Sequence, residues 1–279
     1  SLSEEQLDAM VEKTKALEAY QEAGEDPKAL ECIPMLKRSD IKKEAAKIVN
    51  EELTVDNSLF LYHDVCTNGI GYVDLMFKTD SIAPEQIPYL GLLKSVLGYV
   101  DTEHYTYGEL FNEINANTGG INCGVEVFDR ADSTEEFQAM FSVRGKALYT
   151  KMDFLFKMIG EILNSSKLED TKRLYEIVAS VKSRAQVNLT GAGHSTAVLR
   201  AAAYSSPMAA FQDEMAGIGY YQFIEKLEKD FEQRKEETVE ELCKLMKKIL
   251  RPENFMISYT GERESLETVQ KLAGTVKAG

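Results

Sequence analysis

The spacing of apolar residues in the first part of the chain predicts a solvent-washed amphipathic helix. Between residues 3 and 23, apolar side chains recur near helical intervals among Glu, Lys and Gln, which places them on one helical face. The Gly-Glu-Asp-Pro run at 24–27 predicts the end of this helix. A short second helical segment follows at 28–32, before a break at Pro34. The apolar residues of the first helix are Leu7, Val11, Leu17 and Tyr20.

From residue 46 the pattern changes to the alternation that is typical of strands. Thr67-Asn68-Gly69 lies between two of these runs and predicts a hairpin turn. Long stretches of helical spacing then dominate, interrupted at Gly191, Pro207 and Gly217. The predicted strands are 46–55, 58–66, 71–79, 120–128, 137–143 and 254–259, and the predicted helices are 84–100, 105–117, several segments up to about 250, and 262–272.

This order of elements predicts the fold class. Strands come first, helices follow, and one strand returns near the end, so consecutive elements do not alternate as they do in a parallel α/β protein. We therefore predict an α+β fold with a mostly antiparallel or mixed sheet covered by helices.

Composition narrows the possible partners. The chain has 279 residues, of which 44% are hydrophobic, and a net charge of −14. This charge repels phosphate backbones and anionic lipids, so we expect neither a nucleic-acid nor a membrane partner, whereas cationic peptides would be attracted. The first ten residues lack the pattern of a secretory signal, and we expect a cytoplasmic protein. Because the chain starts at Ser1, we expect it to be an excised part of a longer protein.

The residues that could carry chemistry are few and scattered. Cys32, Cys66, Cys123 and Cys243 are widely spaced, and we expect them to be reduced. His63 and Cys66 have the spacing of a zinc-ligand pair, but on a strand they would point to opposite faces.

Two further histidines are interpreted in structural terms. His104 lies in a predicted connection and is expected to be solvated. His194 lies among small residues and is expected to be buried and hydrogen-bonded to the backbone.

Three short motifs admit a chemical and a structural interpretation. Ser39 and Lys42 match the Ser-x-x-Lys pattern of some hydrolases, but no companion motif follows, and Ser39 is expected to be a helix N-cap. Gly69-Ile70-Gly71 lacks the third glycine of a nucleotide loop and is expected to be a turn. Gly119-Gly120 could cradle an anion or a substrate backbone, or could simply begin a strand.

One stretch resembles a known family. The segment from Ser183 to Leu227, SRAQVNLTGAGHSTAVLRAAAYSSPMAAFQDEMAGIGYYQFIEKL, is similar to the C-terminal half of the presequence-protease branch of the pitrilysin/insulinase zinc metallopeptidases. The resemblance implies a pitrilysin-like or mitochondrial-processing-peptidase-like domain. It also implies a division of the chain into a helical hairpin linker at 1–45 and a domain at 46–279.

The resemblance also implies that this segment is not catalytic. The catalytic half of these enzymes carries His-x-x-Glu-His on a helix, which binds zinc. The corresponding positions here are Leu90, Leu93 and Lys94, which can serve neither as ligands nor as base. Glu176 falls near the position of the third ligand, and we interpret it as a surface or ion-pairing residue. We expect no cofactor in this segment and zinc in the full-length enzyme.

Further implications concern partners and substrates. The helix and strand from Tyr105 to Phe128 resemble those leading into the edge strand that, in the catalytic half, pairs with substrate; whether 119–128 does so here is left open. The expected partners are the catalytic N-terminal half, the fourth domain of the same polypeptide, and peptide substrates. The implied function is a linker, hinge and chamber wall of an endopeptidase acting on unstructured peptides. Two alternatives are a stand-alone inactive homologue acting as a binding or scaffold protein, and an autonomous hydrolase.

Overall fold

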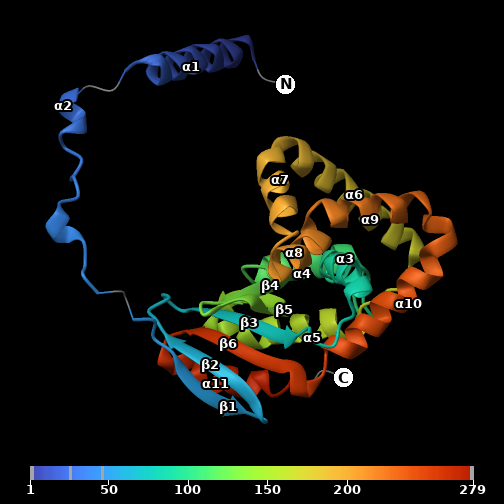
Figure 1. Ribbon diagram of the computed structural model, residues 1–279. Helices are drawn as coiled ribbons and strands as arrows, with labels where there is room; N and C mark the ends of the chain where they lie inside the picture. The colour runs from blue at the N-terminus through green and yellow to red at the C-terminus, as the bar shows by residue number, and fades with distance from the viewer. Residues whose placement is uncertain (1–2, 25–26, 45–46, 277–279) are drawn as a thin grey trace. The chain divides into compact units, whose positions relative to one another are not determined.

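The computed structural model describes residues 3–24, 27–44 and 47–276. The chain separates into two compact units, residues 1–48 and residues 49–279, drawn in Figure 1. This boundary lies close to residue 45, where the sequence predicted it. Each unit is described by itself below.

The described part of the first unit is helical only in places. Helix α1 spans Glu4–Glu22 and begins with a capping box, in which the Ser3 hydroxyl accepts from Gln6 N and the Gln6 side chain accepts from Ser3 N. The second helical segment, α2 (Pro27–Leu30), is a single turn, and a 3₁₀ turn η1 follows at Arg38–Asp40. No residue of α1 is buried.

Ser39 does not cap a helix, contrary to our prediction. It lies inside η1, and the described residues that follow are not helical. The capping role belongs to Asp40, whose carboxylate accepts a hydrogen bond from Lys37 N at 2.7 Å.

The second unit is built on a six-stranded sheet, which confirms the predicted α+β class and the mixed sheet. Only the β2–β6 pair is parallel, and the other neighbours are antiparallel. The strand order is β1-β2-β6-β3-β5-β4, and Figure 1 shows β6 lying between β2 and β3. The strands are β1 (Glu51–Val55), β2 (Ser58–Asp64), β3 (Ile70–Lys78), β4 (Ile121–Arg130), β5 (Ser133–Leu148) and β6 (Phe255–Gly261).

The predicted hairpin at Thr67-Asn68-Gly69 is wrong, because β2 and β3 are separated by β6. The turn itself is present: Asn68 and Gly69 have φ of 54° and 80°. It is fixed by Glu262, which follows β6 and accepts hydrogen bonds from Thr67 N at 2.9 Å, Asn68 N at 3.0 Å and the Tyr149 hydroxyl. The turn therefore connects two strands across the end of an inserted third strand.

The hairpin at this end of the sheet lies earlier in the chain. Asp56 and Asn57 join β1 to β2 with φ of 48° and 69°, the left-handed pair that matches the twist of two antiparallel strands. The first strand is also shorter than predicted and begins at Glu51 rather than at residue 46.

Helices account for most of the remaining chain. The predicted helical regions are confirmed, although several are divided by 3₁₀ turns or by breaks. None of the described helices is long and apolar enough to cross a membrane. They are α3 (Ile87–Val96), α4 (Tyr107–Asn117), α5 (Met152–Ser165), α6 (Thr171–Gly191), α7 (Gly193–Ala202), α8 (Pro207–Ala216), α9 (Ile218–Lys229), α10 (Phe231–Ile249) and α11 (Leu266–Ala273).

The core lies against one face of the sheet. Along β3 the side chains alternate: Val73, Leu75 and Phe77 are buried, whereas Tyr72 on the opposite face is exposed. Helix α5 packs closely on the buried face, because a Cβ added to Gly145 would lie 2.6 Å from Leu155 Cδ1. One face of the sheet is thus covered by apolar helices, and the other is left for polar side chains.

Candidate functional site

Helix α3 carries the positions that correspond to the zinc motif of the resembling family. Leu90, Leu93 and Lys94 lie at i, i+3 and i+4 and therefore share one helical face. Leu90 and Leu93 are fully buried in the core, and Lys94 is partly buried. Burial lowers the pKa of Lys94, and the Glu126 carboxylate only partly opposes this shift. The face holds two apolar side chains and one cation.

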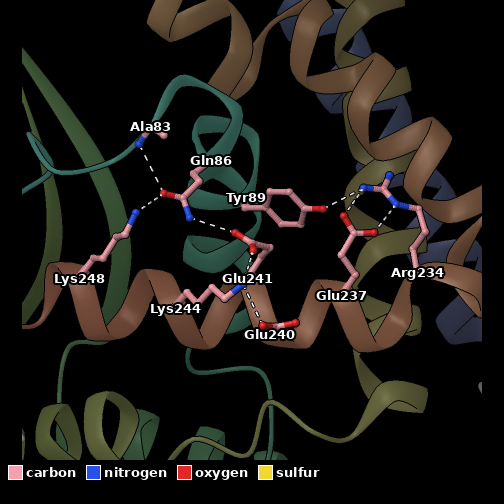
Figure 2. A network of polar contacts seen from close by, with 9 residues as sticks. All are labelled: Ala83, Gln86, Tyr89, Arg234, Glu237, Glu240, Glu241, Lys244 and Lys248. Atoms are coloured by element: carbon pink, nitrogen blue, oxygen red, sulfur yellow. Dashed lines mark hydrogen bonds and ion pairs between the residues drawn. The ribbon is translucent and has the colours of Figure 1, made fainter.

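Contacts with α10 fix the start of α3, as Figure 2 shows. Gln86, just before α3, donates from Nε2 to Glu241 Oε2 at 3.0 Å and accepts at Oε1 from Lys248 Nζ at 2.7 Å. One turn further on, the Tyr89 hydroxyl accepts from Arg234 Nη2 at 2.9 Å. These bonds tie two elements that are about 150 residues apart in sequence.

Glu176 is not on the side of α6 that faces the core. The buried residues of α6 include Leu174, Val178 and Val181, and Glu176 lies two positions from the first two, which turns it to the opposite side. Its carboxylate is half-exposed and accepts from Arg173 Nη1 at 2.9 Å. In residues 3–24, 27–44 and 47–276, no three or more His, Cys, Asp or Glu side chains are grouped so that they could hold a metal ion.

The first of the three histidines bridges two strands. His63 on β2 contacts Val49 O at 2.8 Å through Nδ1 and Ser258 Oγ at 3.2 Å through Nε2. Cys66 lies beyond the end of β2, is exposed, and directs its thiol towards Asn68 Oδ1 at 3.9 Å. Each of these two side chains is therefore accounted for by its own local contacts.

The other two histidines depart from the predictions. His104 is 64% exposed, yet its Nδ1 lies 3.0 Å from the largely buried Glu161 carboxylate, so it is ion-paired as well as solvated when protonated. His194 is exposed at the start of α7 and not buried, because α7 has no buried residue at all.

Gly119-Gly120 begins the edge strand and does not cradle an anion. Gly119 N donates to Lys146 O at 2.8 Å, and Gly120 N donates to Thr118 Oγ1 at 3.0 Å. Gly120 has a φ of 108°, which L side chains rarely adopt. Both amides are thus already used, and the glycines serve to turn the chain into β4, whose only strand partner in the described chain is β5.

The uncovered face of the sheet carries a polar row that sequence reasoning missed. Ser258, Asp74, Arg144 and Asn122 are neighbours across β6, β3, β5 and β4. Arg144 donates from Nε to Asp74 Oδ2 at 2.7 Å and lies 3.1 Å from Glu126 Oε1. Burial raises the pKa of Asp74, and Arg144 opposes this rise. Only the register of distant strands brings these residues together, so no local motif announces them.

This row lies in a hollow with a volume of about 490 Å³. Tyr72, Lys146 and Thr260 extend the lining beyond the row, and backbone of Gly119 and Gly120 closes one end. Tyr72 is 42% exposed, so the hollow opens to solvent. Its aromatic, cationic and hydroxyl groups suit a polar chain such as a peptide.

The Gly-Ile-Gly break singled out in the sequence is organised by Asp213. This aspartate at the end of α8 is 1% exposed and accepts from Ile218 N at 3.0 Å, Gly219 N at 3.1 Å and Arg200 Nη1 at 2.6 Å. A Cβ on Gly217 would clash with the Asp213 carboxylate. The glycines thus allow the start of α9 to close over a buried carboxylate.

Comparison with known families gives a match over most of the chain. The family model described as peptidase M16 (subfamily C) associated matches residues 1–227, which includes the segment around this break. The chain belongs to this peptidase-associated family. The resemblance noted in the sequence is therefore confirmed.

Relatives of this peptidase-associated chain are much longer than it is. Protein HypA of Clostridium perfringens (strain 13 / Type A) is 34% identical over 97% of the chain but only 28% of its own length. Presequence protease 1, chloroplastic/mitochondrial, of Arabidopsis thaliana is 27% identical over 97% of the chain and 25% of its own length. The chain thus spans about a quarter of the relatives it matches.

Solved structures share the fold. The peptidase M16 inactive domain from Pseudomonas fluorescens superposes with a TM-score of 0.54 at 15% identity, covering 82% of this chain and 50% of that one. A conserved protein from Enterococcus faecalis V583 gives 0.59 at 13% identity, over 82% and 52% of the two chains. At these identities the likeness concerns the fold alone.

Proposed function

We propose that this chain is a non-catalytic segment of a zinc-dependent metalloendopeptidase that degrades unstructured peptides. Residues 1–45 act as linker and hinge, and the α+β unit forms a chamber wall on which the catalytic half docks. The catalytic half and a fourth domain belong to the same polypeptide, and zinc is bound by the catalytic half. The proposal includes a cytoplasmic location.

One observation carries this proposal. Nearly the whole chain aligns with about a quarter of a presequence protease, while the helix at the zinc-motif position presents Leu90, Leu93 and Lys94. Neither leucine has a ligand atom, and Zn²⁺ in proteins is bound by Cys, His, Asp and Glu. The alignment supports membership in a peptidase, and the side chains of α3 support a role other than catalysis.

Two surfaces support the structural roles. In α1, Leu7, Val11 and Leu17 form an apolar stripe, and each is about half-exposed. An apolar stripe of this kind on a linker suits packing against another part of the enzyme. The polar hollow of about 490 Å³ on the open sheet face suits a wall that peptides contact.

The direct test measures zinc and cleavage in the purified chain. We expect elemental analysis to find far less than one tightly held zinc per chain, and we expect no cleavage of an unstructured fluorogenic peptide with or without added zinc. About one zinc per chain, or cleavage that a chelator abolishes, would overturn the non-catalytic assignment. A stand-alone binding or scaffold protein is distinguished by peptide binding without any association with a zinc-bearing half.

A further inference from the structure

A second cavity, of about 250 Å³, lies where α3 meets α6, α8 and α9. These helices are adjacent in Figure 1, and α3 contacts α6, α8 and α9. Lys94, Ser95 and Tyr220 line one side, and Arg184, Asn188 and Thr196 line the other. None of its lining residues is acidic, although the chain has 46 acidic and 32 basic residues. The absence of carboxylates from this lining makes the cavity a donor-rich enclosure.

The two cations of the cavity lack protein counterions. Neither Lys94 nor Arg184 forms a hydrogen bond or ion pair with the part of the chain that the structure describes. The carboxylate that acts on Lys94 electrostatically belongs to Glu126, which is itself engaged by Arg144 at 3.1 Å. A partly buried ammonium without a paired carboxylate is costly unless something else supplies the negative charge.

A buried hydroxyl of the same cavity also lacks a partner. Tyr220 is 5% exposed, and its hydroxyl has no hydrogen-bond partner among the described residues. The nearby Ser95 hydroxyl donates to Gly91 O at 3.4 Å instead. Buried hydroxyls are nearly always satisfied, so an orphaned one that lines a cavity indicates a ligand that would accept its hydrogen bond.

The apolar part of the lining restricts the kind of anion. Val181, Leu189 and Met215 lie in the same cavity as the two cations. An inorganic anion would leave these side chains without favourable contacts, whereas a carboxylate on an apolar body would use both parts of the lining. A guanidinium and an ammonium can both bind a carboxylate, Arg184 through two parallel bonds.

We propose that this cavity binds a carboxylate carried on a small apolar group, such as the C-terminal residue of a peptide, with Lys94, Arg184 and the Tyr220 hydroxyl holding the carboxylate. The site is separate from the polar hollow on the sheet. It also stands apart from the proposed peptidase role, because binding requires neither zinc nor a catalytic half.

The test titrates the whole chain by calorimetry with three probes: N-acetyl-L-leucine, its uncharged amide, and inorganic phosphate. We expect N-acetyl-L-leucine to bind, and the other two probes to bind at least about tenfold more weakly, because charge-assisted hydrogen bonds to a carboxylate contribute more than neutral ones. Equal affinity for the amide, tighter binding of phosphate, or no binding of N-acetyl-L-leucine would overturn the proposal.

Variants assign the binding to this cavity. Lys94→Met and Arg184→Gln should each weaken N-acetyl-L-leucine binding about tenfold or more. Tyr220→Phe should weaken it while leaving the urea midpoint unchanged or higher, since the hydroxyl has no partner to lose. Lys182→Met is the matched control: Lys182 is on α6 but pairs with Glu228 at 3.1 Å and does not line the cavity. If Lys182→Met weakens binding as much as Lys94→Met, the cavity is not the site.

Discussion

Replacing Asp213 with alanine should be among the more damaging substitutions in the α+β unit. The Asp213 side chain is 1% exposed, and its carboxylate accepts two backbone amides, Ile218 N at 3.0 Å and Gly219 N at 3.1 Å. No other acceptor for these amides is found in the described chain. Alanine removes the acceptor and leaves both N–H groups at the start of α9, where Gly219 is buried.

The magnitude follows from the two orphaned amides. Each buried donor left without an acceptor costs about 1–3 kcal/mol, so the free energy of unfolding should fall by roughly 2–5 kcal/mol. The ion pair with Arg200 adds little, because Arg200 is 39% exposed and water replaces part of the interaction. Arg200→Ala is therefore the matched control, with an expected loss of about 1 kcal/mol or less.

The assay is urea unfolding followed by circular dichroism, because the chain contains no tryptophan. We expect the order of stability to be wild type, then Arg200→Ala, then Asp213→Ala. If Asp213→Ala loses less than about 1 kcal/mol, or loses less than Arg200→Ala, the hydrogen bonds to the start of α9 are not what stabilises the break.

Three further predictions address other parts of the chain. Leu90→His with Lys94→His should have the same zinc affinity whether or not Glu176→Ala is added, because Glu176 points away from the core side of α6; a loss of affinity in the triple variant would refute this placement. Although burial opposes it, hydrogen bonds from Thr67 lower the pKa of Glu262 from 4.5 to about 2, so its stabilising effect is present above about pH 4.5 and is lost as the pH falls towards 2. Glu262→Gln should therefore lower the urea midpoint at pH 7 and lower it much less near pH 2; an equal loss at both pH values would contradict this. Backbone amides of α1 should exchange with deuterium much faster than those of β3, because α1 has no buried residue, and equal protection would argue against the linker role.

Local sequence signals predicted most elements but not how distant elements pair. Asn68 and Gly69 do form the predicted turn, yet β2 and β3 are not neighbours, because β6 enters between them from almost 200 residues later. A turn motif reports the backbone of a few residues and contains no information about such an insertion. The same limit explains why the pairing of Asp74 with Arg144 was not predicted.

The candidate site was predictable only as far as helical periodicity reaches. The spacing of Leu90, Leu93 and Lys94 correctly places them on one face of a helix. It could not show that Tyr220 and Arg184 approach this helix, because α6 and α9 are brought there by packing. His194 was assigned to the core from its small neighbours, but α7 packs so lightly that none of its residues is buried.

The central claim is that this chain contributes structure, and not chemistry, to a zinc peptidase. The most direct measurement combines the purified chain with a separately purified zinc-bearing half and fourth domain of the same enzyme, and follows cleavage of an unstructured peptide. We predict no cleavage by the chain alone, little by the other parts alone, and cleavage when all are mixed, with the zinc recovered in the other half. Cleavage by this chain alone, or full activity without it, would contradict the claim.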